Sequence, residues 1–165
     1  MNFAELAVLG AEVGDLLKAR GEKVAVIDGA TGGLVSAALV SVPGATRFFA
    51  SGGVVYSLRG RDLLLDLPRE ELATMRSVTE SYALLQAGRF RERLGVAWGL
   101  AETGSAGPNM HPFGVESGAS AIAVVGPGVE RSVTLRTGLD DRISNMFAFA
   151  HGALCLLRDV LREAG

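Results

Sequence analysis

The sequence has few of the side chains from which disulfides and metal sites are built. Its 165 residues include one cysteine, Cys155, and two histidines, His111 and His151. A single thiol excludes an internal disulfide framework and a zinc site made of cysteines, and two histidines are too few for a histidine-rich metal site. No motif indicates a cofactor, so we expect the protein to work with neither a metal nor a cofactor.

Long apolar runs and an excess of basic charge are also missing. No uninterrupted apolar run approaches the roughly 20 residues needed to cross a bilayer. The first basic residue is Lys18, so the N-terminus lacks the positive region of a signal peptide. The formal net charge of −2 gives no basic surface for nucleic acid. We therefore expect a cytoplasmic protein that binds neither membranes nor nucleic acids.

Glycine, by contrast, is abundant, and the rest of the composition is typical of a globular domain. The chain has 22 glycines, well above the usual share of about 7%. Hydrophobic residues make up 48% and charged residues 21%, which argues against disorder and against a coiled coil. The glycine excess predicts many tight turns or close approaches of the backbone.

The spacing of apolar residues predicts helices that alternate with strands. Apolar positions three and four residues apart indicate amphipathic helices, and short β-branched or aromatic runs indicate strands. The predicted helices cover residues 6–20, 34–42, 61–67, 68–76, 77–94 and 140–161. The predicted strands cover residues 23–27, 47–58, 96–102, 119–125 and 130–137.

This order predicts an α/β fold, a three-layer α/β/α sandwich whose last hairpin makes the sheet mixed. The whole chain, residues 1–165, is predicted to form one domain, because no linker or repeat interrupts it. Two local features are expected as well. The glycine pair at 52–53 predicts a bulge or a kink in its strand, and Ser77 with Glu80 matches a capping box at a helix start.

Three loops follow predicted strands and are candidates for the site, since ligands in such folds bind at the carboxyl ends of the strands. They cover residues 28–33, 56–62 and 103–118. The first offers backbone N–H groups at a helix start, which suit an anion such as phosphate. It matches neither the P-loop nor the dinucleotide fingerprint. The alternative is that its glycines only satisfy the dihedral angles of a turn.

The remaining candidates are explained more simply by packing than by chemistry. His111 lies in the long loop and His151 on the last helix, and no carboxylate or second histidine is placed beside either by the sequence. Cys155 has no neighbour in sequence that would lower its pKa. Trp98 alternates with apolar residues in a strand and is expected in the core.

Five short motifs together resemble the CinA C-terminal domain family, which is linked to bacterial competence and includes nicotinamide mononucleotide (NMN) amidohydrolases. They lie at residues 31–33 (Thr-Gly-Gly), 41–45, 52–57, 103–108 and 141–142. The resemblance runs from about Leu6 to Leu161. It implies a three-layer α/β/α fold, in agreement with the pattern of elements. Larger members carry an N-terminal molybdopterin-binding-like domain, which this chain is expected to lack.

The sequence departs from the family pattern at positions where the family places its chemistry. The family has Glu-Ser-Cys before Thr-Gly-Gly, and this chain has Asp28, Gly29 and Ala30. The lysine of the family's Tyr-Ser-Asn-x-x-Lys motif is Arg61, and a second family serine is Thr46. The resemblance implies a hydroxyl nucleophile with a lysine base and no metal. An arginine cannot act as that base because its guanidinium stays protonated.

The resemblance also carries over a set of site positions. The catalytic positions would be Thr46, Tyr56, Arg61 and Thr103. The ligand-binding positions would be Gly29, Ala30, Thr31, Gly32, Gly33, Gly104 and Arg142. We expect the loop at 29–33 to converge with Tyr56, Arg61 and Thr103.

Three functions remain open at this point. The favoured one is a relative that has lost the family reaction and binds a nucleotide or another anion such as NMN. The second is an active NMN amidohydrolase in which Thr46 attacks the amide and NMN yields nicotinate mononucleotide and ammonia. The third is a structural module without a ligand. A homo-oligomer, with a dimer as the first choice, is expected in each case.

Overall fold

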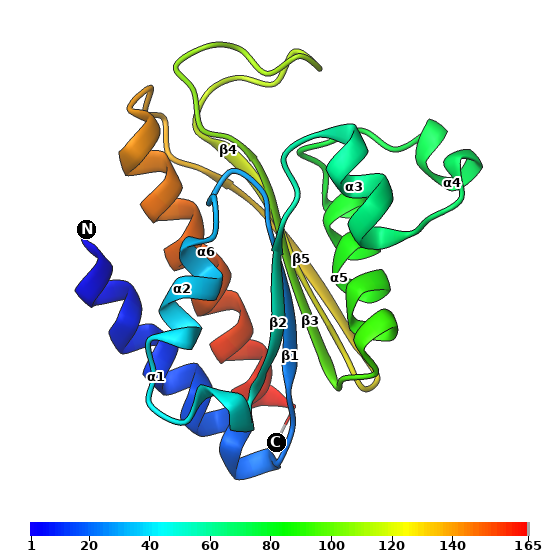
Figure 1. The fold of residues 1–165 in the computed structure, drawn as a ribbon. Coiled ribbons are helices and arrows are strands. Elements are labelled where there is room, and N and C mark those ends of the chain that lie inside the picture. Colours follow the sequence, from blue (N-terminus) through cyan, green and yellow to red (C-terminus); the bar gives the residue numbers. More distant parts are fainter. Residues whose placement is uncertain (165) are drawn as a thin grey trace.

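A five-stranded mixed sheet forms the centre of the structure. The structure is a computed structural model, and it describes residues 1–164 apart from the side chain of Arg69. The strand order is β2-β1-β3-β4-β5 (Figure 1). The strands are β1 (Val24–Asp28), β2 (Phe49–Val54), β3 (Trp98–Ser105), β4 (Ala119–Gly126) and β5 (Val129–Arg136). β1 pairs in parallel with β2 and β3, whereas β4 pairs antiparallel with both β3 and β5. The predicted mixed sheet is confirmed.

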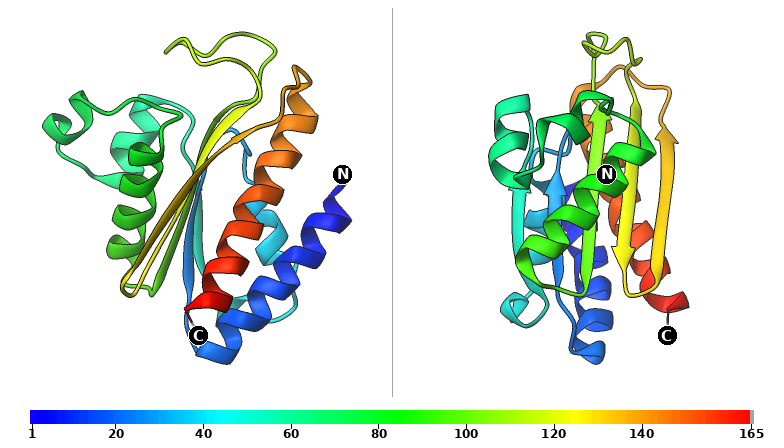
Figure 2. Two further views of the ribbon diagram at one scale, coloured as in Figure 1. Left: turned by 180° about the vertical axis from the view of Figure 1, so that it is seen from behind. Right: turned by 90° about the vertical axis from the view of Figure 1, so that its right-hand side faces the viewer.

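Helices cover both faces of this sheet (Figures 1 and 2). One face carries α1 (Phe3–Arg20), α2 (Leu34–Val40) and α6 (Arg142–Glu163). The other carries α3 (Leu58–Leu65) and α5 (Glu80–Leu94), with the short α4 (Arg69–Ala73) beyond α3. A 3-10 turn, Ala45–Arg47, leads into β2. The predicted three-layer α/β/α arrangement is therefore confirmed.

Apolar side chains fill the spaces on both sides of the sheet, because successive side chains of a strand point to opposite faces. Val24 and Val26 of β1 belong to the cluster beneath α1, α2 and α6. Ala25 and Ile27 belong to the cluster beneath α5. Trp98 is fully buried in the first cluster, as predicted. Every residue of β1 and β4 is buried, which is usual for strands covered on both faces.

The predicted bulge at the glycine pair is wrong. Gly52 and Gly53 pair in regular register with Val26 and Ile27, and the irregularity lies earlier, at Ala50. Gly52 is needed for a different reason. A Cβ atom there would overlap the side chain of Ser36, so α2 can approach β2 only because this residue has no side chain.

Two predicted boundaries also differ from the structure. The N-cap of α5 is Thr79, whose hydroxyl accepts a hydrogen bond from Tyr82 N, and not Ser77. Glu80 instead accepts hydrogen bonds from two hydroxyls of β5, which removes it from a capping box. β3 continues to Ser105, because its pairing with β4 runs as far as Ala119. Residues 103–105 are therefore strand and not loop.

Candidate functional site

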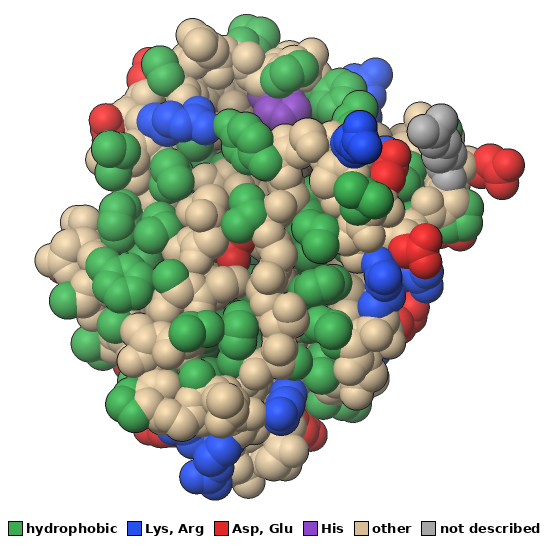
Figure 3. All heavy atoms as spheres, viewed as in Figure 1, with side chains coloured by type: hydrophobic (Ala, Val, Ile, Leu, Met, Phe, Trp, Pro, Cys, Tyr) green, Lys and Arg blue, Asp and Glu red, His purple; other side chains and the backbone are tan. Residues whose placement is uncertain are grey.

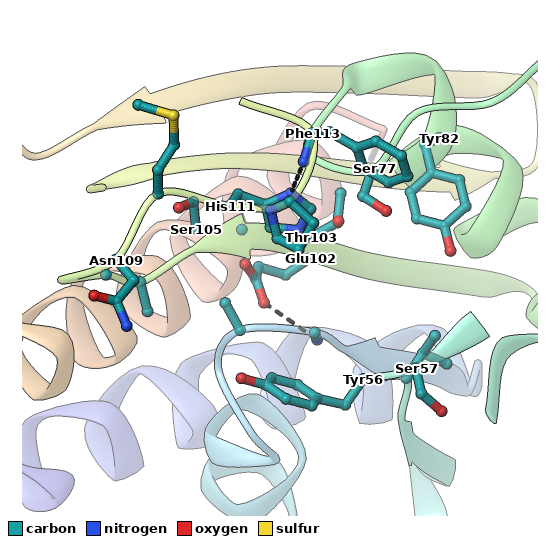
Figure 4. Close-up of a pocket in the computed structure, with 18 of the residues that line it drawn as sticks. Tyr56, Ser57, Ser77, Tyr82, Glu102, Thr103, Ser105, Asn109, His111 and Phe113 are labelled. Atoms are coloured by element: carbon teal, nitrogen blue, oxygen red, sulfur yellow. Dashed lines mark hydrogen bonds between the residues drawn. The ribbon is translucent and has the colours of Figure 1, made fainter. Parts of the chain in front are cut away.

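A cavity of about 490 Å³ opens beyond the carboxyl ends of the parallel strands β1 and β3. We call it the pocket. Its walls come from residues 29–30 after β1, residues 55–58 after β2, residues 102–113 along β3 and its loop, α5, and the start of α6. Figure 4 shows Tyr56, Tyr82, His111 and Glu102 reaching it from four of these segments. The loops that were predicted to carry the site therefore do meet.

The side chain of Asp28 binds the free N–H groups at the N-terminus of α2. Its buried carboxylate accepts hydrogen bonds from Val35 N at 3.1 Å, Ser36 N at 3.2 Å and Ser36 Oγ at 2.6 Å. Thr31 Oγ1 donates to the same group at 2.7 Å. A carboxylate of the protein thus occupies the place where an external anion would bind. The geometry therefore favours the alternative that the glycines satisfy the dihedral angles of a turn, since Gly32 and Gly33 have φ values of 63° and 100°.

Glu102 supplies a second buried carboxyl group from the middle of β3. Its Oε2 accepts hydrogen bonds from Gly29 N at 3.2 Å and Thr31 N at 3.0 Å, and its Oε1 accepts one from Ser120 Oγ at 2.7 Å. Figure 4 shows this carboxyl group directed at the loop after β1. Burial raises the pKa of Glu102, and the nearby charge of Asp28 acts in the same direction.

The floor of the pocket, formed by Gly29, Glu102 and Gly104, has no room for further side chains. A Cβ atom at Gly29 would lie 2.5 Å from the backbone oxygen of Glu102. A Cβ atom at Gly104 would lie 2.6 Å from Glu102 Oε1. The family serine that Gly29 replaces therefore has no space in this backbone. Glycine at both positions is required by the buried carboxyl group and the strand that carries it.

Sequence reasoning did not single out Glu102 as a site residue. The signal was present, because an acidic side chain stood in a strand that was otherwise apolar, and such a charge is seldom buried without partners. The predicted strand ends at residue 102, and a charged residue at the end of a strand is unremarkable. Pairing with β4 extends the strand beyond it.

The mouth of the pocket is formed by Tyr56 and Arg142, both exposed. Arg142 donates from Nη2 to the Tyr56 hydroxyl and from Nη1 to the backbone oxygen of Gly107, each at 2.7 Å. These bonds join three segments that are far apart in sequence. Among the described residues that line the pocket, Arg142 is the only lysine or arginine. The mouth is therefore cationic, whereas the floor carries a carboxyl group.

The wall between floor and mouth includes Thr103, Tyr82 and Gln86, all more than nine-tenths buried. Thr103 Oγ1 accepts a hydrogen bond from Val78 N at 3.1 Å, so its own proton is free to be donated. Burial raises the pKa of Tyr82 and keeps the phenol protonated. Gln86 Oε1 is buried and has no hydrogen-bond partner among the described residues.

His111 is half-buried in the wall of the pocket, which agrees with the simpler interpretation of a packed or half-exposed histidine. Its Nδ1 accepts a hydrogen bond from Phe113 N at 3.2 Å. Burial lowers the pKa of His111, so the neutral imidazole is favoured. With Nδ1 accepting, the proton of the neutral ring sits on Nε2. His111 is thus a hydrogen-bond donor.

The structure brings some of the expected site residues together and leaves others out. Tyr56 and Thr103 line the pocket, as do the expected ligand-binding positions Gly29, Ala30, Gly104 and Arg142. Thr31, Gly32 and Gly33 do not line it. The expected convergence is therefore confirmed for the first part of the loop at 29–33, for Tyr56 and for Thr103.

Thr46 and Arg61 are not in the pocket. Thr46 lies exposed in the 3-10 turn before β2, which is the amino end of the parallel strands and the opposite end from the pocket. Arg61 lies on α3 and lines a neighbouring groove. Its Nε and Nη2 donate to Asp62 Oδ1 at 3.1 Å and 3.0 Å. Neither residue lines the pocket, so the lining gives no support to their expected catalytic roles there.

The described residues offer neither a cluster of metal ligands nor a membrane-spanning helix. Residues 1–164 contain no group of three His, Cys, Asp or Glu side chains that could hold a metal ion. None of the helices described is long and apolar enough to span a bilayer. On the face drawn in Figure 3, the lysine and arginine side chains are spread over several places and do not form one basic patch.

Comparison with known proteins gives one consistent family. The model of the CinA C-terminal domain matches residues 6–161. A CinA-like protein of Anaeromyxobacter sp. (strain K) is 38% identical over 147 residues, covering 88% of this chain and 36% of that protein. A CinA-like protein of Chlorobium phaeobacteroides (strain BS1) is 33% identical over 155 residues, and the match covers 92% of this chain and 37% of that protein. The chain thus spans about a third of the length of these relatives.

Solved structures agree with the fold. The competence damage-inducible protein A (ComA) of Klebsiella pneumoniae subsp. pneumoniae MGH 78578 is 25% identical, with a TM-score of 0.87, covering 95% of this chain and 97% of that one. A CinA superfamily protein of Klebsiella pneumoniae 700603 superposes with a TM-score of 0.88 at 23% identity, covering 96% of this chain and 98% of that one. At such an identity the second comparison establishes the fold alone.

Proposed function

The chain belongs to the CinA C-terminal domain family, and from this premise we propose that its pocket binds a mononucleotide such as NMN without hydrolysing the amide. The proposal has two parts, loss of the family reaction and retention of a ligand. The observation that carries it is the composition of the pocket, which keeps Tyr56, Thr103 and Arg142 but contains neither Thr46 nor Arg61.

The arrangement of side chains supports the loss of amide hydrolysis. The resemblance implies a hydroxyl nucleophile and a lysine base, and no lysine is present among the described residues that line the pocket. Arg61 stays protonated and is hydrogen-bonded to Asp62 in the adjacent groove. Thr46 lies beyond the other end of the sheet. Removing one acid–base group alone lowers a rate by about 10²–10⁴-fold, and here a nucleophile is missing as well.

The charges of the pocket support the binding of a mononucleotide in one orientation. A volume of about 490 Å³ is within the range of small-molecule sites. The cationic mouth at Arg142 suits the phosphate. The nicotinamide ring of NMN carries a positive charge, because its nitrogen is bonded to ribose, and that charge is favoured beside the Glu102 carboxyl group. The ligand would enter with its ring toward the floor.

Two measurements on the purified protein test the two parts. We expect calorimetry with NMN to detect binding, and we expect ammonia release from NMN to stay at the uncatalysed level. A family member with an intact serine and lysine is the positive control. Turnover at about 1 s⁻¹ or faster would show that the reaction is retained. Absence of heat at millimolar NMN, where binding contributes only about 4 kcal/mol, would favour a structural module instead.

Self-association remains a prediction of its own. The homo-oligomer expected from the sequence, with a dimer as the first choice, does not depend on the ligand. Light scattering of the free protein tests it directly, and a monomer at micromolar concentration would contradict it.

A further inference from the structure

A second groove lies beside the pocket, and the proposed function makes no use of it. We call it the arginine groove. It is lined by the first residues of α3, by residues 72–76 at the end of α4 and by Pro112 and Phe113 of the loop after β3. These segments lie at the same end of the sheet as the pocket (Figure 1). Its volume of about 1440 Å³ exceeds that of the pocket, so it has room for a further part of a ligand.

The arginine groove is continuous with the pocket. Leu58, Pro112 and Phe113 line both of them. The chain also leads from one to the other, because Tyr56 at the mouth of the pocket is followed by Leu58 at the junction and by Arg59 in the groove. The side chains of Leu58 and Phe113 are exposed at this junction. A ligand held in the pocket can therefore extend past the mouth and along the groove.

The arginine groove carries an excess of positive charge, although the formal net charge of the chain is −2. Its described lining includes Arg59, Arg61 and Arg76 but only one acidic residue, Asp62. Asp62 is paired with Arg61, whose Nη2 lies 3.0 Å from Oδ1. Arg59 and Arg76 are exposed and form no ion pair within the described part of the chain. Arg59 also lies in the first turn of α3, where its charge adds to the positive end of the helix dipole. Two guanidinium groups are therefore available to an anion.

We infer that the ligand is a dinucleotide, whose second phosphate and nucleoside leave the pocket and lie in the arginine groove. The first phosphate stays at Arg142, and the second is bound by Arg59 and Arg76, since guanidinium groups donate paired hydrogen bonds to phosphate. The exposed ring of Phe113 offers a surface on which the second base can stack. An acidic peptide would suit the arginines alone, whereas a dinucleotide also explains why the groove opens from the pocket. The inference rests on the proposed function, because it places the NMN half of the ligand in the pocket.

The decisive experiment compares NMN with NAD, in which the phosphate of NMN is joined to adenylate. Calorimetry is performed on the wild type, on the double variant Arg59→Gln/Arg76→Gln and on the matched control Lys23→Gln/Arg47→Gln. The control removes the same charge from two exposed residues at the amino ends of β1 and β2, the opposite end of the sheet. We expect the wild type and the control to bind NAD at least about 10-fold more tightly than NMN. The groove variant should lose most of this preference, keep the NMN affinity of the wild type within about 3-fold at about 0.15 M salt, and melt within about 2 °C of the wild type.

Every other outcome decides a stated part. If the wild type binds NMN and NAD equally, the inference fails and the proposed function stands. If the groove variant keeps the preference for NAD, or if the control loses it to the same extent, the arginine groove does not hold the second phosphate and the inference fails. If only NAD binds, and the groove variant loses it, the inference stands and the mononucleotide of the proposed function is replaced by a dinucleotide. If neither ligand binds to the wild type, both fail.

Discussion

Substituting Gly29 by serine tests how the floor of the pocket is built. In the family pattern this position holds a serine, and its restoration is the first step of any attempt to recover amide hydrolysis. The Cβ atom of the new residue would lie 2.5 Å from the backbone oxygen of Glu102 and 3.1 Å from Thr103 Cα. Both neighbours belong to β3, which is held between β1 and β4. The backbone of the loop must therefore move.

The expected loss of stability follows from two contributions. Forcing a side chain into a filled space costs about 1–3 kcal/mol. Moving the loop also lengthens the hydrogen bonds that Gly29 N and Thr31 N donate to Glu102, and a hydrogen bond to a charged group contributes about 1.5–3 kcal/mol. Partial loss of these bonds gives a total of about 3 kcal/mol. For a domain of this size, the melting temperature falls by about 6–12 °C.

The assay is urea denaturation of the wild type, Gly29→Ser and a matched control, Gly88→Ser. A Cβ atom at Gly88, on α5, meets no other atom within 4 Å. The control should be about 0.5 kcal/mol more stable than the wild type, because serine is the better helix former. A Gly29→Ser protein as stable as the wild type would refute the steric argument. The fourfold change Gly29→Ser, Ala30→Cys, Thr46→Ser and Arg61→Lys should fail to restore ammonia release for the same reason.

Three further outcomes are expected. Burial raises the folded-state pKa of Glu102 above its ordinary value of 4.5, so the stability that the protonated Glu102 contributes is lost as the pH rises through the folded-state pKa. Glu102→Gln should therefore become more stable relative to the wild type as the pH rises over this range, as measured by urea titrations. Asn145→Ala should lower stability by about 2–4 kcal/mol and speed hydrogen exchange in residues 106–118, because Nδ2 donates to Ala106 O and Leu139 O from a fully buried site. Arg142→Met should leave stability within about 0.5 kcal/mol, since the guanidinium is exposed, yet weaken NMN binding by about 10-fold or more in calorimetry.

The architecture could be predicted from the sequence because it depends on periodicity, which is local. The stripe of apolar residues in α6 and the β-branched run of β1 specify their structures without reference to the rest of the chain. Close approaches between elements are not local. Gly52 was interpreted as a bulge because nothing in its own strand shows that Ser36 of α2 lies against it.

The candidate site could be predicted only in part, and the failures have one cause. Which loops follow strands is visible in the sequence, so Tyr56 and Thr103 were correctly placed in the pocket. The hydrogen-bond partner of each buried polar group is not visible in the sequence. The amide groups near residue 29 are satisfied by Glu102, more than 70 residues away. Gln86 is a polar residue on a predicted helix, and only the packing of α5 shows that it is buried.

Several features that oppose stability lie around the pocket, and this supports the proposal that the pocket binds a ligand. Val78 adopts a φ of 61°, a strained value for a β-branched residue, and its N–H holds Thr103 in the wall. Arg142 places a cation in the first turn of α6, where the helix dipole disfavours it. Gln86 buries an unpaired oxygen, and Glu102 buries a carboxyl group. Sequence and structure usually agree at every level except where function demands otherwise, and four such conflicts around one cavity are most simply explained by binding.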